Sequence, residues 1–171
     1  MAILRSRAAA RPAIDLGRVE SAVAALELVE PVFKTCPWQP RDLVITGLRQ
    51  WLRCCGAALR DGRMIGMPSH AVDEAWHGLI LCTERYADFC AAAYGRFLHH
   101  YPEGAGPRHG TPEPVQRQLG RTVVAWSLVA QPGERCVLWD LDTVVGVQRP
   151  WGVCADQVAA VESELARLAA G

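Results

Sequence analysis

Apolar residues recur every three to four positions along most of this 171-residue chain, and this helical spacing restricts its fold more than any other feature. Several of the runs are followed by proline or glycine, which typically end or bend a helix. We therefore expect an all-α protein with about six helices. The runs cover residues 13–31, 40–62, 69–81, 83–95, 111–130 and 154–171.

The segment 136–147 lacks this helical spacing. Its sequence, "CVLWDLDTVVGV", is apolar and rich in β-branched residues, and it is short. Such a segment fits a short β-hairpin that turns near Asp142. A buried irregular segment fits the same residues almost as well.

The length is typical of one domain, and the sequence predicts a single helical domain over 13–171. Residues 1–12 contain arginines and alanines without a helical apolar stripe, so we expect a flexible basic arm there. The stretch 102–114, "PEGAGPRHGTPEP", holds four prolines and three glycines and is expected to be a loop, with Thr111 capping the helix that follows.

The chain carries 18 basic and 18 acidic residues, and this balance argues against a generally basic nucleic-acid-binding surface. No stretch of about 18 uncharged apolar residues is present, so no membrane partner is expected. Seven cysteines occur without any CxxC pair, and the N-terminus lacks the apolar core of a secretory signal. We expect a cytoplasmic protein, and the preference for arginine over lysine indicates a bacterial source with GC-rich coding.

Four of the five histidines lie within residues 69–102, together with acidic, aromatic and thiol side chains. On one helix, Asp73 and His77 are one turn apart and project to the same side. On the next, Tyr86 and Cys90 are likewise one turn apart. A helix pair that meets across a short corner would bring Cys90 toward His77.

The neighbouring histidines His99 and His100 should point to different faces, so at most one of them is expected to enter a shared centre. A set of one carboxylate, one thiol and imidazoles suits Zn²⁺ or Fe²⁺. We predict direct ligation by Asp73, His77, Cys90 and one of these two histidines. The predicted surrounding residues are His70, Trp76 and Tyr86.

The same side chains also fit a metal-free polar network in which Asp73 accepts a hydrogen bond from His77 and Cys90 packs as a small apolar residue. Under the metal hypothesis the chain would be a metal-dependent hydrolase or oxidase acting on a small molecule. Under the alternative it would be a non-enzymatic helical module that binds another protein. The sequence does not decide between enzyme and interaction module.

The stretch "VDEAWHGLILCTERYADFCAAAYGRFLHH", residues 72–100, follows a pattern VDxxWHxxIL, then YxxxC, then GxxxHH. In this pattern it resembles the N-terminal helical domain of glycine-rich domain-containing proteins and their small bacterial relatives of unknown function. The resemblance implies a stand-alone helical domain without the glycine-rich tail. It also implies that the Asp, His, Cys and His positions act as a unit, and it brings no established reaction, substrate or cofactor.

Overall fold

The computed structural model describes residues 13–34, 36–101, 114–151, 163, 164, 166 and 167. These residues form six α-helices and one 3-10 helix, and none of them belongs to a β-strand, which confirms the all-α prediction. The elements are α1 (Leu16–Ala25), η1 (Glu30–Phe33), α2 (Arg41–Asp61), α3 (His70–Leu81), α4 (Thr83–Tyr94), α5 (Val115–Val129) and α6 (Leu141–Val144).

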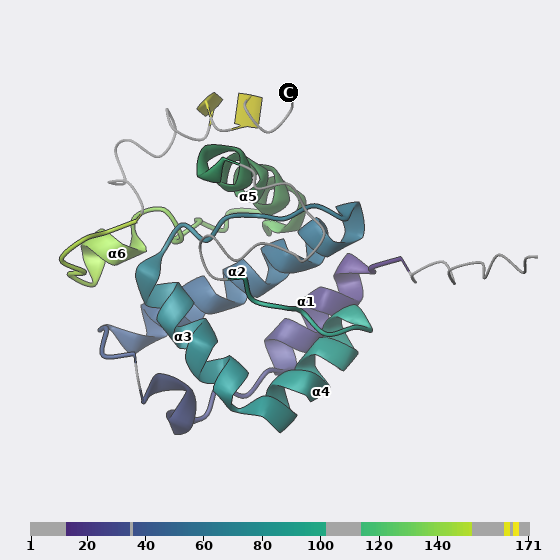
Figure 1. The fold of residues 1–171 in the computed structure, drawn as a ribbon, viewed down its shortest axis with the longest axis horizontal. Coiled ribbons are helices and arrows are strands. Elements are labelled where there is room, and N and C mark those ends of the chain that lie inside the picture. The colour runs from purple at the N-terminus through teal and green to yellow at the C-terminus, as the bar shows by residue number, and fades with distance from the viewer. Residues whose placement is uncertain (1–12, 35, 102–113, 152–162, 165, 168–171) are drawn as a thin grey trace, which may run out of the picture.

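The long helix α2 is central to the fold, and α1, α3 and α5 pack around it (Figure 1). Its side chains Leu48 and Leu52 are completely buried, as the helical apolar spacing requires. The helix begins after Pro40 and ends at Gly62, which has a φ of 68° and so adopts the left-handed conformation that glycine tolerates best. Both ends agree with the sequence prediction.

Helix α1 is shorter than its apolar run. The Asp15 side chain accepts hydrogen bonds from the amides of Gly17 and Arg18, which sets the start, but the helix ends at Ala25. The prediction extended it to Pro31. That proline instead lies in the first turn of η1, where its missing N–H costs nothing.

Helices α3 and α4 form the predicted corner. The Ser69 hydroxyl caps α3 by accepting from the amide of Val72, as expected. The N-cap of α4 is Cys82, one residue before the predicted cap. Gly78 allows η1 to pack closely on α3, because a Cβ there would lie 1.8 Å from the Val32 carbonyl oxygen.

The expected β-hairpin at 136–147 is wrong. The segment forms a turn followed by α6, and its backbone bonds are local: the amide of Leu141 donates to the carbonyl of Val137, and that of Val144 to the carbonyl of Asp140. Most of the apolar residues that suggested strands are buried, and α6 packs against α2 and α3, although Val144 is 56% exposed. Burial, and not strand pairing, explains the apolar composition.

An ion-pair network around the buried Arg53 joins α2 to α1 and to the turn after α5. Arg53 on α2 is buried, pairs with Glu20 and Glu134, and lies over the ring of Trp126. Gln50, one turn earlier, donates to Glu134 and accepts from the amide of Val137. The polar groups of this network are therefore paired, as burial requires.

The predicted basic arm 1–12, the Thr111 cap within the loop 102–113, and most of the tail helix 154–171 lie outside the described residues. Helix α5 ends at Val129 with Ala130 as its cap, in agreement with the prediction. No helix in the described part of the chain combines the length and apolar character needed to cross a membrane.

Candidate metal centre

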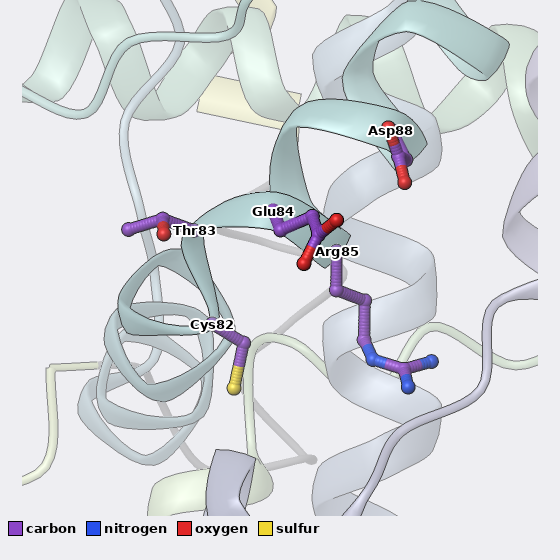
Figure 2. A pocket seen from close by; sticks show the side chains of 5 residues that line it. All are labelled: Cys82, Thr83, Glu84, Arg85 and Asp88. Atoms are coloured by element: carbon purple, nitrogen blue, oxygen red, sulfur yellow. The ribbon is translucent and has the colours of Figure 1, made fainter.

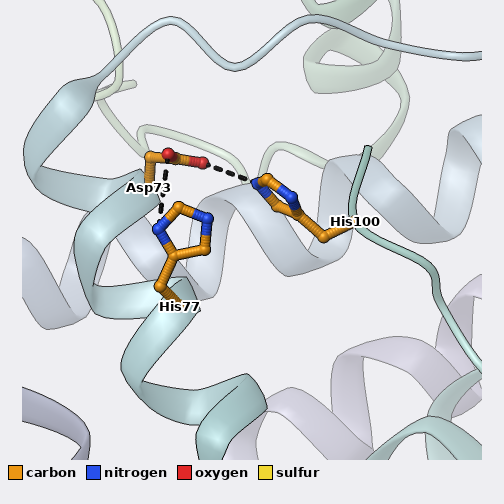
Figure 3. A group of neighbouring side chains, drawn as sticks. All are labelled: Asp73, His77 and His100. Carbon is orange, nitrogen blue, oxygen red and sulfur yellow. Dashed lines mark hydrogen bonds and ion pairs between the residues drawn. The ribbon is translucent and has the colours of Figure 1, made fainter. Parts of the chain in front are cut away.

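Asp73, His77 and His100 form a compact group in which one ligand atom from each residue lies within 4.8 Å of the other two (Figure 3). Asp73 and His77 come from α3, one turn apart, as their spacing predicts. His100 comes from the non-helical segment that follows α4. The structure thus brings together residues separated by 27 positions in the sequence.

The Asp73 carboxylate lies between the two imidazoles. Its Oδ1 is 3.1 Å from His100 Nε2, and its Oδ2 is 3.7 Å from His77 Nδ1. The two imidazole ring centres are 4.5 Å apart. The Asp73 side chain is only 12% exposed, whereas the His77 side chain is 47% exposed. The group therefore has a buried carboxylate and one side that solvent reaches.

The segment 96–101 explains why only one of the adjacent histidines joins the group. Its exposure alternates: Leu98 is buried and His100 mostly buried, while Phe97, His99 and Tyr101 are exposed. The ring of His99 lies between Phe97, at 5.1 Å, and Tyr101, at 6.3 Å. The structure thus brings His100 to Asp73 and leaves His99 on the surface.

Cys90 is not a member of the group. It is completely buried on α4. Burial raises the pKa of its thiol, and hydrogen bonds with the Leu98 backbone and the Tyr86 hydroxyl offset only part of that rise. A buried thiol of raised pKa behaves as a packing residue, which fits the metal-free interpretation of this position. The same holds for the vicinal pair Cys54 and Cys55, whose pKa values burial also raises.

Trp76 packs directly against the group, and Tyr86 lies behind Trp76. The Trp76 indole packs edge-on against the His100 ring, with the ring centres 4.7 Å apart. Its Nε1 donates to the Tyr86 hydroxyl at 3.2 Å, and that hydroxyl donates to the carbonyl of Leu98 at 2.8 Å. Burial raises the pKa of Tyr86, so its hydroxyl remains a donor at any physiological pH.

His70 lies outside the group. Its Nε2 is 3.8 Å from Glu74 Oε1, and its ring contacts those of Trp38 and Trp151. As residue 70 opens α3, it is separated from His77 by about two helical turns. The structure therefore gives His70 a different set of neighbours from Asp73.

Sequence reasoning missed Asp142, whose carboxylate is 1% exposed and lies at the N-terminus of α3. It accepts hydrogen bonds from the Ser69 hydroxyl and from the backbone amides of His70, Ala71 and Trp151, at 2.7 to 3.0 Å. The sequence does contain a signal for it. Asp142 lies within an apolar run, and a carboxylate that is buried with such a run needs hydrogen-bond donors around it.

A surface depression of about 550 Å³ lies at the corner between α3 and α4 (Figure 2). Acidic and basic side chains share its lining, and none of the lining residues belongs to the Asp73, His77 and His100 group. The lining residues are Cys82, Thr83, Glu84, Arg85 and Asp88. The depression therefore does not extend the candidate metal centre.

Comparison with known proteins finds a family model that matches the part of the chain containing these three residues. The UCP032817-like family model matches residues 24–122, more than half of the chain, and the matched range includes Asp73, His77 and His100. No curated protein and no solved structure matches the chain. These comparisons show no link to glycine-rich domain-containing proteins, so that resemblance stays a hypothesis. The chain belongs to the UCP032817-like family.

Proposed function

We propose that Asp73, His77 and His100 bind a divalent transition-metal ion, either Zn²⁺ or Fe²⁺. The observation that carries this proposal is the convergence of three ligand atoms, from α3 and from the segment after α4, within 4.8 Å of one another. Two ligand atoms that each lie about 2.0–2.1 Å from one ion at a tetrahedral angle are about 3.3 Å apart. The 3.1 Å distance from Asp73 Oδ1 to His100 Nε2 is close to that value, and His77 Nδ1 lies 3.7 Å from the other carboxylate oxygen, Oδ2.

Two imidazoles and one carboxylate are a donor set used by catalytic metal sites, because three protein ligands leave further coordination positions free. Zinc in such a site supplies an activated water for hydrolysis, and ferrous iron supplies dioxygen chemistry. The His77 side chain is half exposed, so solvent reaches this side of the group, and this supports access by a small molecule. A metal-dependent hydrolase or oxidase is therefore the function class that we favour.

Metal analysis of protein purified without an affinity tag tests the proposal. We expect close to one equivalent of zinc or iron per chain, or uptake of one equivalent from added Zn²⁺ or Fe²⁺. Less than about a tenth of an equivalent, with no response to added metal, would remove the hypothesis. His77→Ala should abolish uptake, and His99→Ala is the matched control because this neighbouring histidine lies outside the group.

A non-enzymatic interaction module is the second candidate. It is supported by the direct hydrogen bond between Asp73 and His100, at 3.1 Å, which pairs the buried carboxylate without an ion. On this hypothesis the polar group only fixes the helix pair, and an outer face binds a protein partner. His77→Ala would then change stability without changing metal content.

A further inference from the structure

We propose that Tyr86 is a positioning residue that holds His100 in place for metal binding. This inference rests on the proposed metal centre. His77 and Asp73 are fixed by α3, whereas His100 lies on a segment with no helical hydrogen bonds of its own. Something other than secondary structure must therefore hold the His100 backbone.

The Tyr86 hydroxyl supplies that restraint at Leu98, two residues before His100. It donates to the Leu98 carbonyl at 2.8 Å, and both residues are buried. A hydrogen bond of this kind, shielded from water, is costly to break because the carbonyl would be left unpaired. The segment is thus tied to α4 close to the point where it delivers the imidazole.

Trp76 links this restraint to the helix that carries the other two ligands. Its indole N–H donates to the Tyr86 oxygen at 3.2 Å, while the hydroxyl itself donates to the Leu98 carbonyl. The same indole packs against the His100 ring. Trp76 directly precedes His77 on α3, so one chain of contacts connects both imidazoles.

The test compares Tyr86→Phe with Tyr94→Phe. Tyr94 is a matched control: it is also buried on α4, and its hydroxyl also donates to a backbone carbonyl, that of Leu52, at 2.8 Å. That carbonyl belongs to α2 and not to the segment bearing His100. Both variants should lose stability, but only Tyr86→Phe should change the metal site.

Co²⁺ serves as the probe because its visible absorption reports both occupancy and coordination geometry. We expect Tyr86→Phe to bind Co²⁺ about 10-fold more weakly, with an altered absorption spectrum, as is typical when a residue that orients a metal ligand is removed. Tyr94→Phe should bind within about twofold of the wild type, with an unchanged spectrum.

Equal affinities and identical spectra for the two variants would overturn the role of Tyr86 while leaving the metal centre intact. A wild-type protein that binds no Co²⁺, Zn²⁺ or Fe²⁺ would overturn the metal centre and this inference with it. If Tyr86→Phe does not fold, Trp76→Phe decides, because it removes the N–H that bonds the Tyr86 hydroxyl together with part of the indole that packs on the His100 ring. Unchanged Co²⁺ binding in a folded Trp76→Phe would then count against the proposal.

Discussion

Two buried carboxylates lie at helix α3, Asp73 as one of its residues and Asp142 packed against its N-terminus from α6, and they differ in how completely they are hydrogen-bonded. Asp142, near its N-terminus, accepts four hydrogen bonds. Asp73, within the helix, has one hydrogen bond to His100 and a longer ion-pair contact to His77. A carboxylate has about four acceptor positions, so Asp142 is saturated and Asp73 is not.

Their positions relative to α3 explain the difference. The first amides of a helix have no internal partners, so Asp142 can be held by the backbone of His70 and Ala71 and by the positive end of the helix dipole. The amides around Asp73 are already used within α3, and only side chains can pair with it. Those side chains are imidazoles, which are also metal ligands.

The comparison separates two roles for a buried acid. Asp142 lies in a closed arrangement that joins α6 to α3 and has no capacity left for a ligand. Asp73 keeps unused acceptor capacity beside the half-exposed His77. We therefore expect Asp142 to be needed for stability and Asp73 for metal binding.

The largest effect is expected at Asp142. Asp142→Ala leaves the Ser69 hydroxyl and three backbone amides without their acceptor, and each buried donor left unpaired costs about 1–3 kcal/mol. We predict a loss of at least about 3 kcal/mol in the free energy of unfolding, measured by urea denaturation. Asp142→Asn, which keeps one acceptor oxygen, should lose less. A loss below about 1 kcal/mol for the alanine variant would contradict the assignment of Asp142 as the saturated anchor.

The second effect concerns Asp73 and its imidazoles. Metal at 100 times its dissociation constant should raise the unfolding free energy of the wild type by about 2.7 kcal/mol. His77→Ala should remove this gain, while metal-free stability changes by less than about 1 kcal/mol because the side chain is half exposed. Thermal denaturation with and without Zn²⁺ measures both quantities. A variant that is strongly destabilised without metal would place His77 in a structural network instead.

A third carboxylate, Glu134, extends the comparison because its main partner, Arg53, carries a permanent positive charge. Burial alone would raise its pKa, but hydrogen bonds from Arg53, the Gln131 amide and Gln50 lower it below the ordinary value. A lowered pKa in the folded state means that the ionised group stabilises the fold above the unfolded-state pKa. That contribution is lost as the pH falls through the lowered value.

Glu134→Gln should therefore cost about 1–2 kcal/mol at pH 7. The difference from the wild type should shrink as the pH falls below about 4.5 and disappear once the wild-type carboxyl is protonated. Urea denaturation across this pH range measures the change. A difference that stays constant down to pH 2 would show that Glu134 acts through packing and not through its charge.

The smallest effect is expected at His99. Its side chain is exposed among Phe97 and Tyr101 and lies outside the group around Asp73. His99→Ala should change stability by no more than about 0.5 kcal/mol and leave metal affinity unchanged. Calorimetric titration of Zn²⁺ into this variant and into His100→Ala compares the two neighbours. Loss of binding in both would show that the segment 96–101 rearranges around the metal.

Local sequence signals determined the helices and their relation to the polar residues. Proline and glycine set the ends of α2, Ser69 capped α3, and the spacing of Asp73 and His77 placed both on one side of that helix. The expectation that His99 and His100 face different ways also needed only local geometry. These features depend on a few neighbouring residues, so they can be inferred without the rest of the fold.

Only the tertiary structure decided which residues meet. Contacts between distant segments brought His100 to Asp73, kept Cys90 in the core, and carried Asp142 to Ser69, which precedes it by 73 positions. The same contacts turned an apolar segment into α6 where its composition favoured a hairpin. A sequence pattern records which side of its own helix a residue occupies, whereas the partner on another element depends on how all the elements pack against α2.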